Sequence, residues 1–137
     1  MITTTGDVGE VSITTDDDVV RVRQIVRSYA QQVKLSLVDQ TKLVTAASEL
    51  ARNTLVYGGG GAARVEFVSD GRRSGVRAWF HDDGPGIPDT TLALADGWTS
   101  GNGLGLGLSG ARRLVDEFTL DTEVGRGTDI TVLKWSR

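Results

Sequence analysis

Four consecutive glycines, Gly58 to Gly61, separate two differently patterned parts of the chain. Before them, apolar residues recur at helical spacing in two segments, about 16–33 and 37–57. After them, alternating polar and apolar residues predict strands over 63–69 and 75–81, joined by a polar turn. Because glycine readily ends a helix, we expect the second helix to stop at this run and the chain to continue into a β-hairpin.

The remaining segments predict a strand at the start of the chain, a third helix and two closing strands. Residues 10–15 alternate like a short strand, and Asp16 to Asp18 are expected to cap the helix that follows. Residues 82–103 predict a long ordered loop with one helical turn near 88–95. Apolar spacing from Leu108 to Phe118 predicts the third helix, and 118–123 with 128–135 predict a closing hairpin. Strands in hairpins favour an α+β fold, a two-layer sandwich with helices on one face of a mixed sheet.

Composition limits the chemistry that this chain can perform. Its 137 residues suffice for one domain, 1–137, and a net charge of -3 gives nothing global to attract nucleic acid or an anionic membrane. The absence of cysteine and the single histidine, His81, exclude thiolate and multi-histidine metal sites. Neither a membrane-spanning run of about 20 apolar residues nor a signal peptide is recognisable, so we expect a cytoplasmic protein.

The stretch Ser100 to Gly110, SGNGLGLGLSG, has five glycines in eleven residues. Its second half matches the GxGxxG pattern of dinucleotide-binding loops, but no buried strand precedes it, as that motif requires. A Walker phosphate loop is excluded because no Lys-Ser or Lys-Thr follows the glycines. Taken alone, the stretch leaves open a simple flexible turn before an amphipathic helix.

Two further motifs indicate a nucleotide site. Asp82 ends a predicted strand and begins DDGPGIP; its carboxylate can accept a hydrogen bond from an exocyclic amine such as that of adenine. Glu49 and Asn53 are four residues apart and share one helix face. An amide oxygen suits Mg²⁺, and a neighbouring carboxylate can take a proton from an attacking hydroxyl. Each motif alone is also explained by solvated surface residues, and Thr128 matters only if it faces the same pocket.

In this order, the motifs resemble those of the GHKL, or Bergerat, ATP-binding fold of gyrase, Hsp90 chaperones, histidine kinases and MutL. Glu49–Asn53 resembles its N box, Asp82–Gly86 its G1 box, Gly101–Leu106 its G2 box behind an ATP lid, and Gly125–Thr128 its final glycine-threonine element. Over nearly its whole length the chain is similar to the small bacterial serine/threonine kinases of anti-sigma type. The closest likeness lies in residues 47–53, 84–89, 113–118 and 134–135.

The resemblance implies Glu49 as general base, Asn53 as Mg²⁺ ligand and Asp82 as partner of the adenine amine. Further ATP-binding positions that it implies are Gly84, Gly86, Ile87, Gly101, Asn102, Gly103, Leu104, Gly105, Leu106, Gly107 and Thr128. It implies a serine or threonine on a STAS-domain antagonist or scaffold protein as substrate, and a PP2C-type phosphatase regulatory domain that the released kinase activates. An anti-sigma factor with kinase activity and a non-catalytic ATP-gated binding module are the alternatives.

The predicted site is short of cations. No Lys or Arg occurs from Asp83 to Ala111, so the lid brings no positive side chain to the triphosphate. Glycine N–H groups and Mg²⁺ supply part of the neutralisation that phosphoryl transfer needs. We expect Arg52, Arg112 or a partner residue to supply the rest.

Overall fold

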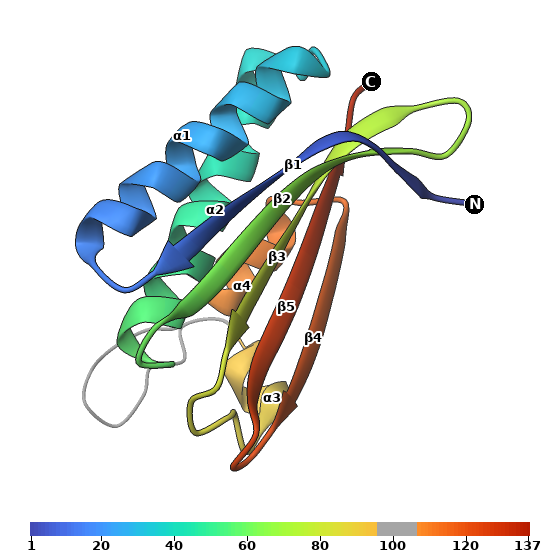
Figure 1. The fold of residues 1–137 in the computed structure, drawn as a ribbon. Coiled ribbons are helices and arrows are strands. Elements are labelled where there is room, and N and C mark those ends of the chain that lie inside the picture. The colour runs from blue at the N-terminus through green and yellow to red at the C-terminus, as the bar shows by residue number, and fades with distance from the viewer. Residues whose placement is uncertain (96–106) are drawn as a thin grey trace.

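The computed structural model describes residues 1–95 and 107–137. Within these residues the strands form one sheet, and α1, α2 and α4 lie on one side of it (Figure 1). This arrangement confirms the two-layer α+β sandwich. The elements in chain order are β1 (Thr3–Ile13), α1 (Asp16–Gln32), α2 (Leu37–Val56), β2 (Gly61–Ser69), β3 (Ser74–Asp82), α3 (Thr90–Ala93), α4 (Leu108–Arg113), β4 (Glu117–Glu123) and β5 (Gly127–Trp135).

The sheet has the strand order β1-β2-β3-β5-β4, and every neighbouring pair in the described residues is antiparallel. The prediction of a mixed sheet is therefore wrong. A single crossover helix would have made β1 and β2 parallel. Instead, α1 and α2 form a helical hairpin that returns the chain to the end of the sheet where β1 stops, so β2 runs back along β1.

Both long helices match the predicted segments to within one residue at each end. The acidic run does not supply the N-cap of α1, which is Thr15. Asp18 reaches back instead, and its Oδ2 accepts the N–H of Thr15 at 3.0 Å. Ser36 caps α2 by accepting the N–H of Asp39 at 3.1 Å, and the glycine run begins two residues after the helix ends. None of the helices in the described ranges is long and apolar enough to cross a membrane.

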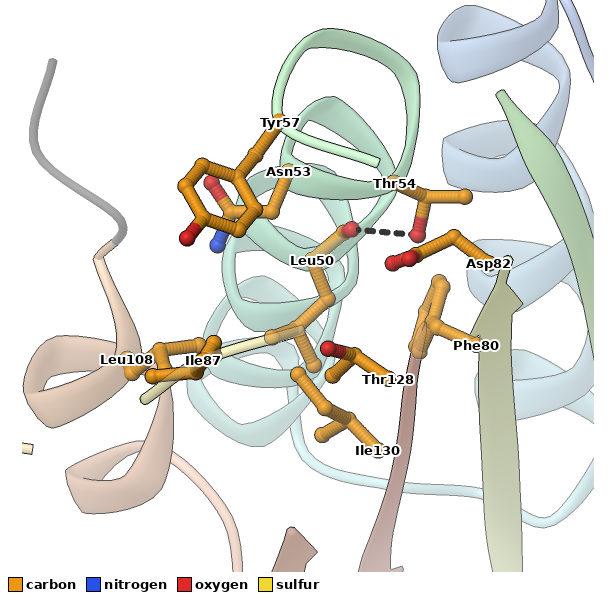
Figure 2. Close-up of a pocket in the computed structure, with 10 residues that line it drawn as sticks. All are labelled: Leu50, Asn53, Thr54, Tyr57, Phe80, Asp82, Ile87, Leu108, Thr128 and Ile130. Atoms are coloured by element: carbon orange, nitrogen blue, oxygen red, sulfur yellow. Dashed lines mark hydrogen bonds between the residues drawn. The ribbon is translucent and has the colours of Figure 1, made fainter. Parts of the chain in front are cut away.

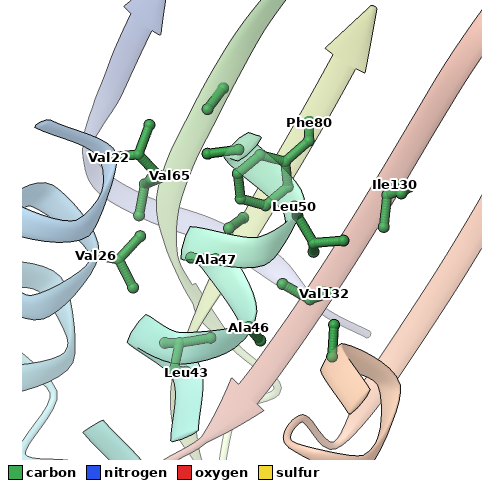
Figure 3. Packing of buried hydrophobic residues seen from close by; sticks show 14 of the residues in the cluster. Val22, Val26, Leu43, Ala46, Ala47, Leu50, Val65, Phe80, Ile130 and Val132 are labelled. Atoms are coloured by element: carbon green, nitrogen blue, oxygen red, sulfur yellow. The ribbon is translucent and has the colours of Figure 1, made fainter. Parts of the chain in front are cut away.

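The main core fills the space between the helices and the sheet (Figure 3). Its members from α2 and the central strands are almost fully buried, and burying each large side chain contributes about 1.5–3 kcal/mol. This packing fixes α2 against β3 and β5, which determines where the exposed side of the same helix presents its polar residues. The α2 and strand residues labelled in this view are Leu43, Ala46, Ala47, Leu50, Val65, Phe80, Ile130 and Val132.

Two predicted boundaries differ from the structure. β1 begins at Thr3 rather than at residue 10, and a bulge between Thr5 and Val8 separates its two halves. The third helix ends at Arg113, so its predicted extension to Phe118 is wrong. Three residues later the chain joins the sheet, because the N–H of Asp116 donates to the carbonyl of Leu133 at 2.9 Å. Phe118 packs against the same core, but from β4.

The other face of the sheet has no helix on it among the described residues (Figure 1). A small second cluster of Val68, Leu133 and Trp135 is buried there, and the guanidinium of Arg73 lies 4.3 Å from the centre of the Trp135 ring. The sheet therefore has two faces, each with its own buried cluster. Alternation along β3 places Phe80 and Asp82 toward the helices and His81, which lies between them, toward this second face.

Candidate nucleotide site

A hollow of about 320 Å³, including its open mouth, lies between α2 and the adjoining ends of β3 and β5 (Figure 2). Its inner wall is apolar, and its polar groups are few, which is typical of a small-molecule site. Side chains reach it from four parts of the chain: α2, the central strands, the loop after β3 and α4. The lining residues are Leu50, Asn53, Thr54, Tyr57, Phe80, Asp82, Ile87, Leu108, Thr128 and Ile130.

Asp82 provides the buried charge of the hollow. It is the last residue of β3 and only 6% exposed. Its Oδ1 accepts the N–H of Gly84 at 2.9 Å, and no other hydrogen bond to this carboxylate comes from residues 1–95 or 107–137. Burial raises the pKa of Asp82, since it disfavours the charged form. The second oxygen is thus suited to a ligand that brings a hydrogen-bond donor.

Three glycines allow the backbone to approach this carboxylate and the loop that follows it. A Cβ on Gly58 would lie 2.4 Å from Cγ of Asp82, and one on Gly84 would lie 2.8 Å from Cα of Gly58. Gly86 has a φ of 77° and approaches the carbonyl of Glu123 so closely that a side chain would collide with it. The glycine run after α2 therefore shapes the site as well as ending the helix.

The loop after β3 is anchored from both sides of the hollow. The hydroxyl of Tyr57 donates to the carbonyl of Gly86 at 3.1 Å. On the other side, the hydroxyl of Thr122 accepts the N–H of Ile87 at 2.9 Å and lies 2.8 Å from the hydroxyl of Thr128. These contacts hold the apolar side chain of Ile87 against the hollow.

Glu49 and Asn53 lie on the outer side of the hollow, on successive turns of α2. Asn53 is half-buried and lines it, whereas Glu49 is exposed. Glu49 instead lies beside Gly107, the N-cap of α4, where a Cβ would be 2.6 Å from Oε2 of the carboxylate. Gly107 also has a φ of 66°, a backbone conformation that favours glycine. The carboxylate of Glu49 therefore lies beside the N-terminus of α4.

The structure brings the described candidate residues together. Asn53, Asp82, Ile87 and Thr128 line the hollow, Gly84 and Gly86 form the loop at its edge, and Glu49 with Gly107 lies beside it. Thr128 faces the same pocket as the other motifs, which was the condition for its relevance. The predicted positions Gly101, Asn102, Gly103, Leu104, Gly105 and Leu106 lie outside the described residues.

Sequence reasoning missed several lining residues that the same periodicities could have found. Tyr57 is four residues after Asn53 and therefore shares its helix face. Phe80 and Ile130 are each two residues from a strand residue of the site, Asp82 and Thr128, and so share their sheet face. The helical spacing also predicts Leu50, Thr54 and Leu108 on the inward sides of their helices, but it gives no sign that they line the site.

Residues 38–136 match a protein family described as histidine kinase-, DNA gyrase B- and HSP90-like ATPase. The chain belongs to this family. A curated relative, the serine/threonine-protein kinase RsbT of Bacillus subtilis (strain 168), is 43% identical over 127 residues, which cover 93% of this chain and 96% of the relative.

Two solved structures show the same HSP90-like ATPase fold. The RsbU and RsbW domains of Rv1364c from Mycobacterium tuberculosis give a TM-score of 0.67 at 21% identity, over 96% of this chain and 33% of that one. The catalytic domain of the histidine kinase ThkA gives a TM-score of 0.53 at 14% identity, over 94% and 95% of the two chains. At these identities the likeness concerns the fold alone.

The chemistry of the lining residues suits the adenine base of the ATP that this family uses. Apolar side chains flank it, and the carboxylate of Asp82 offers an acceptor for the amine of adenine. No group of three or more acidic or histidine side chains in residues 1–95 and 107–137 could hold a metal by itself. A single amide oxygen, that of Asn53, nevertheless suits Mg²⁺, which takes most of its ligands from water and substrate phosphates.

Proposed function

We propose that residues 1–137 form one protein kinase domain, which transfers the γ-phosphoryl group of ATP to a serine or threonine of another protein. One observation carries this proposal: three polar groups follow one another from the inside of the hollow of an HSP90-like ATPase fold to its outer side. They are the buried carboxylate of Asp82, the amide of Asn53 and the exposed carboxylate of Glu49. The serine/threonine-protein kinase RsbT, identical at 43% of positions, supports the choice of acceptor.

Asp82 binds the amine of adenine in this proposal, and the apolar wall with Phe80 and Ile130 contacts the base. Asn53 would hold Mg²⁺, which when bound neutralises phosphate charge. Glu49 is exposed and lies beside the hollow, so a hydroxyl of a protein substrate can reach it. The hydroxyl oxygen bonds to the γ-phosphorus, the bond to the bridging oxygen of ADP breaks, and Glu49 takes the hydroxyl proton.

The proposed protein substrate is a STAS-domain antagonist or scaffold, and the proposed second partner is the regulatory domain of a PP2C-type phosphatase. The likeness to the anti-sigma type of kinase over nearly the whole chain supports both.

Arg52 and Arg112 are proposed to help neutralise the transferring phosphoryl group. Arg52 precedes Asn53 on α2, Arg112 lies on α4, and both side chains are exposed. Neither forms an ion pair with another described residue, so each is free to meet an anionic ligand. If charge reversal at each position leaves the transfer rate unchanged, these two arginines have no such role.

The decisive experiment incubates the protein with labelled ATP and a STAS-domain protein from the same genome, and locates the phosphate by mass spectrometry. Transfer to serine or threonine supports the kinase; ATP binding without transfer to any site identifies a non-catalytic ATP-gated module. Glu49→Gln should retain ATP binding and lose about 100-fold or more in single-turnover transfer. Glu117→Gln, at an exposed position on β4, is the matched control and should transfer at the wild-type rate.

A further inference from the structure

His81 lies between two carboxylates on the face of the sheet opposite the hollow. Its Nδ1 is 2.8 Å from Oδ1 of Asp129, and its Nε2 is 3.0 Å from Oδ1 of Asp83. The ring of Trp79 stacks on the imidazole with centroids 5.4 Å apart. The imidazole is thus held in one orientation by three contacts, although a third of its surface is exposed.

This cluster lies directly behind the polar end of the hollow. In the register of β3 and β5, His81 is opposite Asp129, and the next pair along is Asp82 opposite Thr128. The second pair faces the hollow. Asp83 starts the loop whose next residue, Gly84, donates its N–H to Asp82. His81 therefore connects the first loop residue to the neighbouring strand at the position that presents Asp82.

Only the imidazolium can make both contacts as a donor. A neutral imidazole carries one N–H, so one of the two carboxylates would face a lone pair. Arg126 extends the cluster, since it is 3.6 Å from Asp129 and also pairs with Asp121 and Glu123.

On β2, Arg64 is the charged residue beside this cluster. It is paired with Trp79, and its guanidinium lies 5.8 Å from the centre of the Trp79 ring. Burial lowers the pKa of His81, but the hydrogen bonds and charges of Asp129 and Asp83 outweigh it and raise the pKa above its ordinary value.

We infer that His81 is a positioning residue for the nucleotide site: as the imidazolium it fastens Asp83 to Asp129 and holds the end of β3 in the form in which Asp82 faces the ligand. This inference rests on the proposed function, in that the hollow binds ATP. Deprotonation releases one carboxylate, so the end of β3 loosens and ATP affinity falls as the pH rises through the pKa of His81. By linkage, bound ATP favours the protonated ring.

The chain offers a direct measurement, because His81 is its only histidine. The imidazole proton resonance of His81 is titrated by NMR in the free protein and at saturation with ATP and Mg²⁺. The pKa of His81 should be higher with ATP than without. An equal pKa in both states overturns the inference. Asp83→Asn separates positioning from direct attraction to the phosphates: the rise should disappear in this variant, and a rise that persists overturns the inference.

Calorimetry provides the affinity that the NMR titration does not. His81→Gln should bind ATP about threefold or more weakly than the wild type at about pH 6, and equally well at a pH well above the pKa that the NMR titration measures, where the wild-type ring is neutral. The ionisation of ATP itself also changes its affinity with pH, but equally for both proteins. The comparison therefore uses the ratio of the two dissociation constants at each pH. Arg64→Gln, on the same face, is the control and should match the wild type at both pH values.

Equal affinity of His81→Gln and the wild type at about pH 6 overturns the role of His81 while leaving the proposed function intact. If the wild type binds no ATP at either pH, the proposed function fails and the inference fails with it.

Discussion

Gly58 has no room for a side chain, because Asp82 occupies the space where one would lie. A Cβ at this position would be 2.4 Å from Cγ and 2.6 Å from Oδ2 of Asp82, whereas ordinary contacts begin at 3.4 Å. Gly84 also packs closely here, since a Cβ on Gly84 would lie 2.8 Å from Cα of Gly58. Gly58→Ala must therefore displace the carboxylate of Asp82 by about 1 Å.

A displacement of this size breaks a hydrogen bond between the carboxylate and a bound amine. A hydrogen bond to a charged group is worth about 1.5–3 kcal/mol, and each 1.4 kcal/mol is a factor of ten in affinity. The dissociation constant for ATP should therefore rise about 10- to 150-fold. The same overpacking should lower the free energy of unfolding by about 1–3 kcal/mol.

Titration calorimetry with ATP and Mg²⁺ measures the affinity, and a thermal melt of the same sample verifies the fold. Gly110→Ala is the control: its Cβ would meet nothing within 4 Å, and alanine favours the helix, so affinity should be unchanged and stability equal or higher. A folded Gly58→Ala protein with wild-type affinity refutes the reasoning. Gly84→Ala, which disturbs the same contact from the other side, gives the answer if Gly58→Ala does not fold.

Three further substitutions probe the polar groups of the hollow. Asn53→Ala should abolish Mg²⁺-dependent ATP binding, and calorimetry that finds unchanged affinity with Mg²⁺ contradicts the metal role. Since burial raises the pKa of Asp82, its ionisation opposes folding as the pH rises through that pKa. Asp82→Asn should therefore melt at pH 7 no lower than the wild type and yet bind ATP about tenfold or more weakly; a lower melting temperature with intact binding would reverse the assignment. Tyr57→Phe loses the hydrogen bond to the carbonyl of Gly86 and should weaken ATP binding about fivefold, so an unchanged dissociation constant argues against this anchor.

Local periodicity predicted most of the fold and several residues of the site. The 3.6-residue period located α1 and α2 because each buries one face, and the same period put Asn53 beside the buried stripe. Strand alternation implies that Asp82 points inward if Trp79 and His81 lie on the opposite face, and the structure has this arrangement. These predictions succeeded because they concern neighbours along one element.

The errors concern contacts between segments far apart in the sequence. No local pattern tells how β1 and β2 pair, since that depends on the path of two intervening helices. Likewise, the third helix was predicted too long because Phe118 satisfies the apolar period, although it reaches the core from β4. A hydrogen bond to Leu133 in another strand decides where that segment joins the sheet.

The residues that carried the family resemblance divide into two physical groups. Those near Asn53 and Asp82 contact the hollow, but those near Asp116 and Lys134 lie elsewhere and bind the framework together. The carboxylate of Asp116 accepts the N–H of Trp135 at 2.7 Å, and Nζ of Lys134, buried with its side chain only 7% exposed, lies 3.6 Å from Asp39 and 3.8 Å from Asp116.

Asp39 belongs to the first turn of α2, the helix that carries Glu49 and Asn53 at its other end. The buried lysine therefore fixes one end of the helix to the sheet, while Gly58 fixes the other end against Asp82. Removing Lys134 would leave the partly buried carboxylate of Asp39 without its cation, whereas Asp116 would keep its contact with Arg137. The loss of one partner costs about 3–5 kcal/mol in buried pairs and somewhat less here. A likeness that includes such framework residues argues that the relatives share the placement of α2 over β3 and β5, and this placement is what brings an amide, a buried carboxylate and a threonine to one hollow.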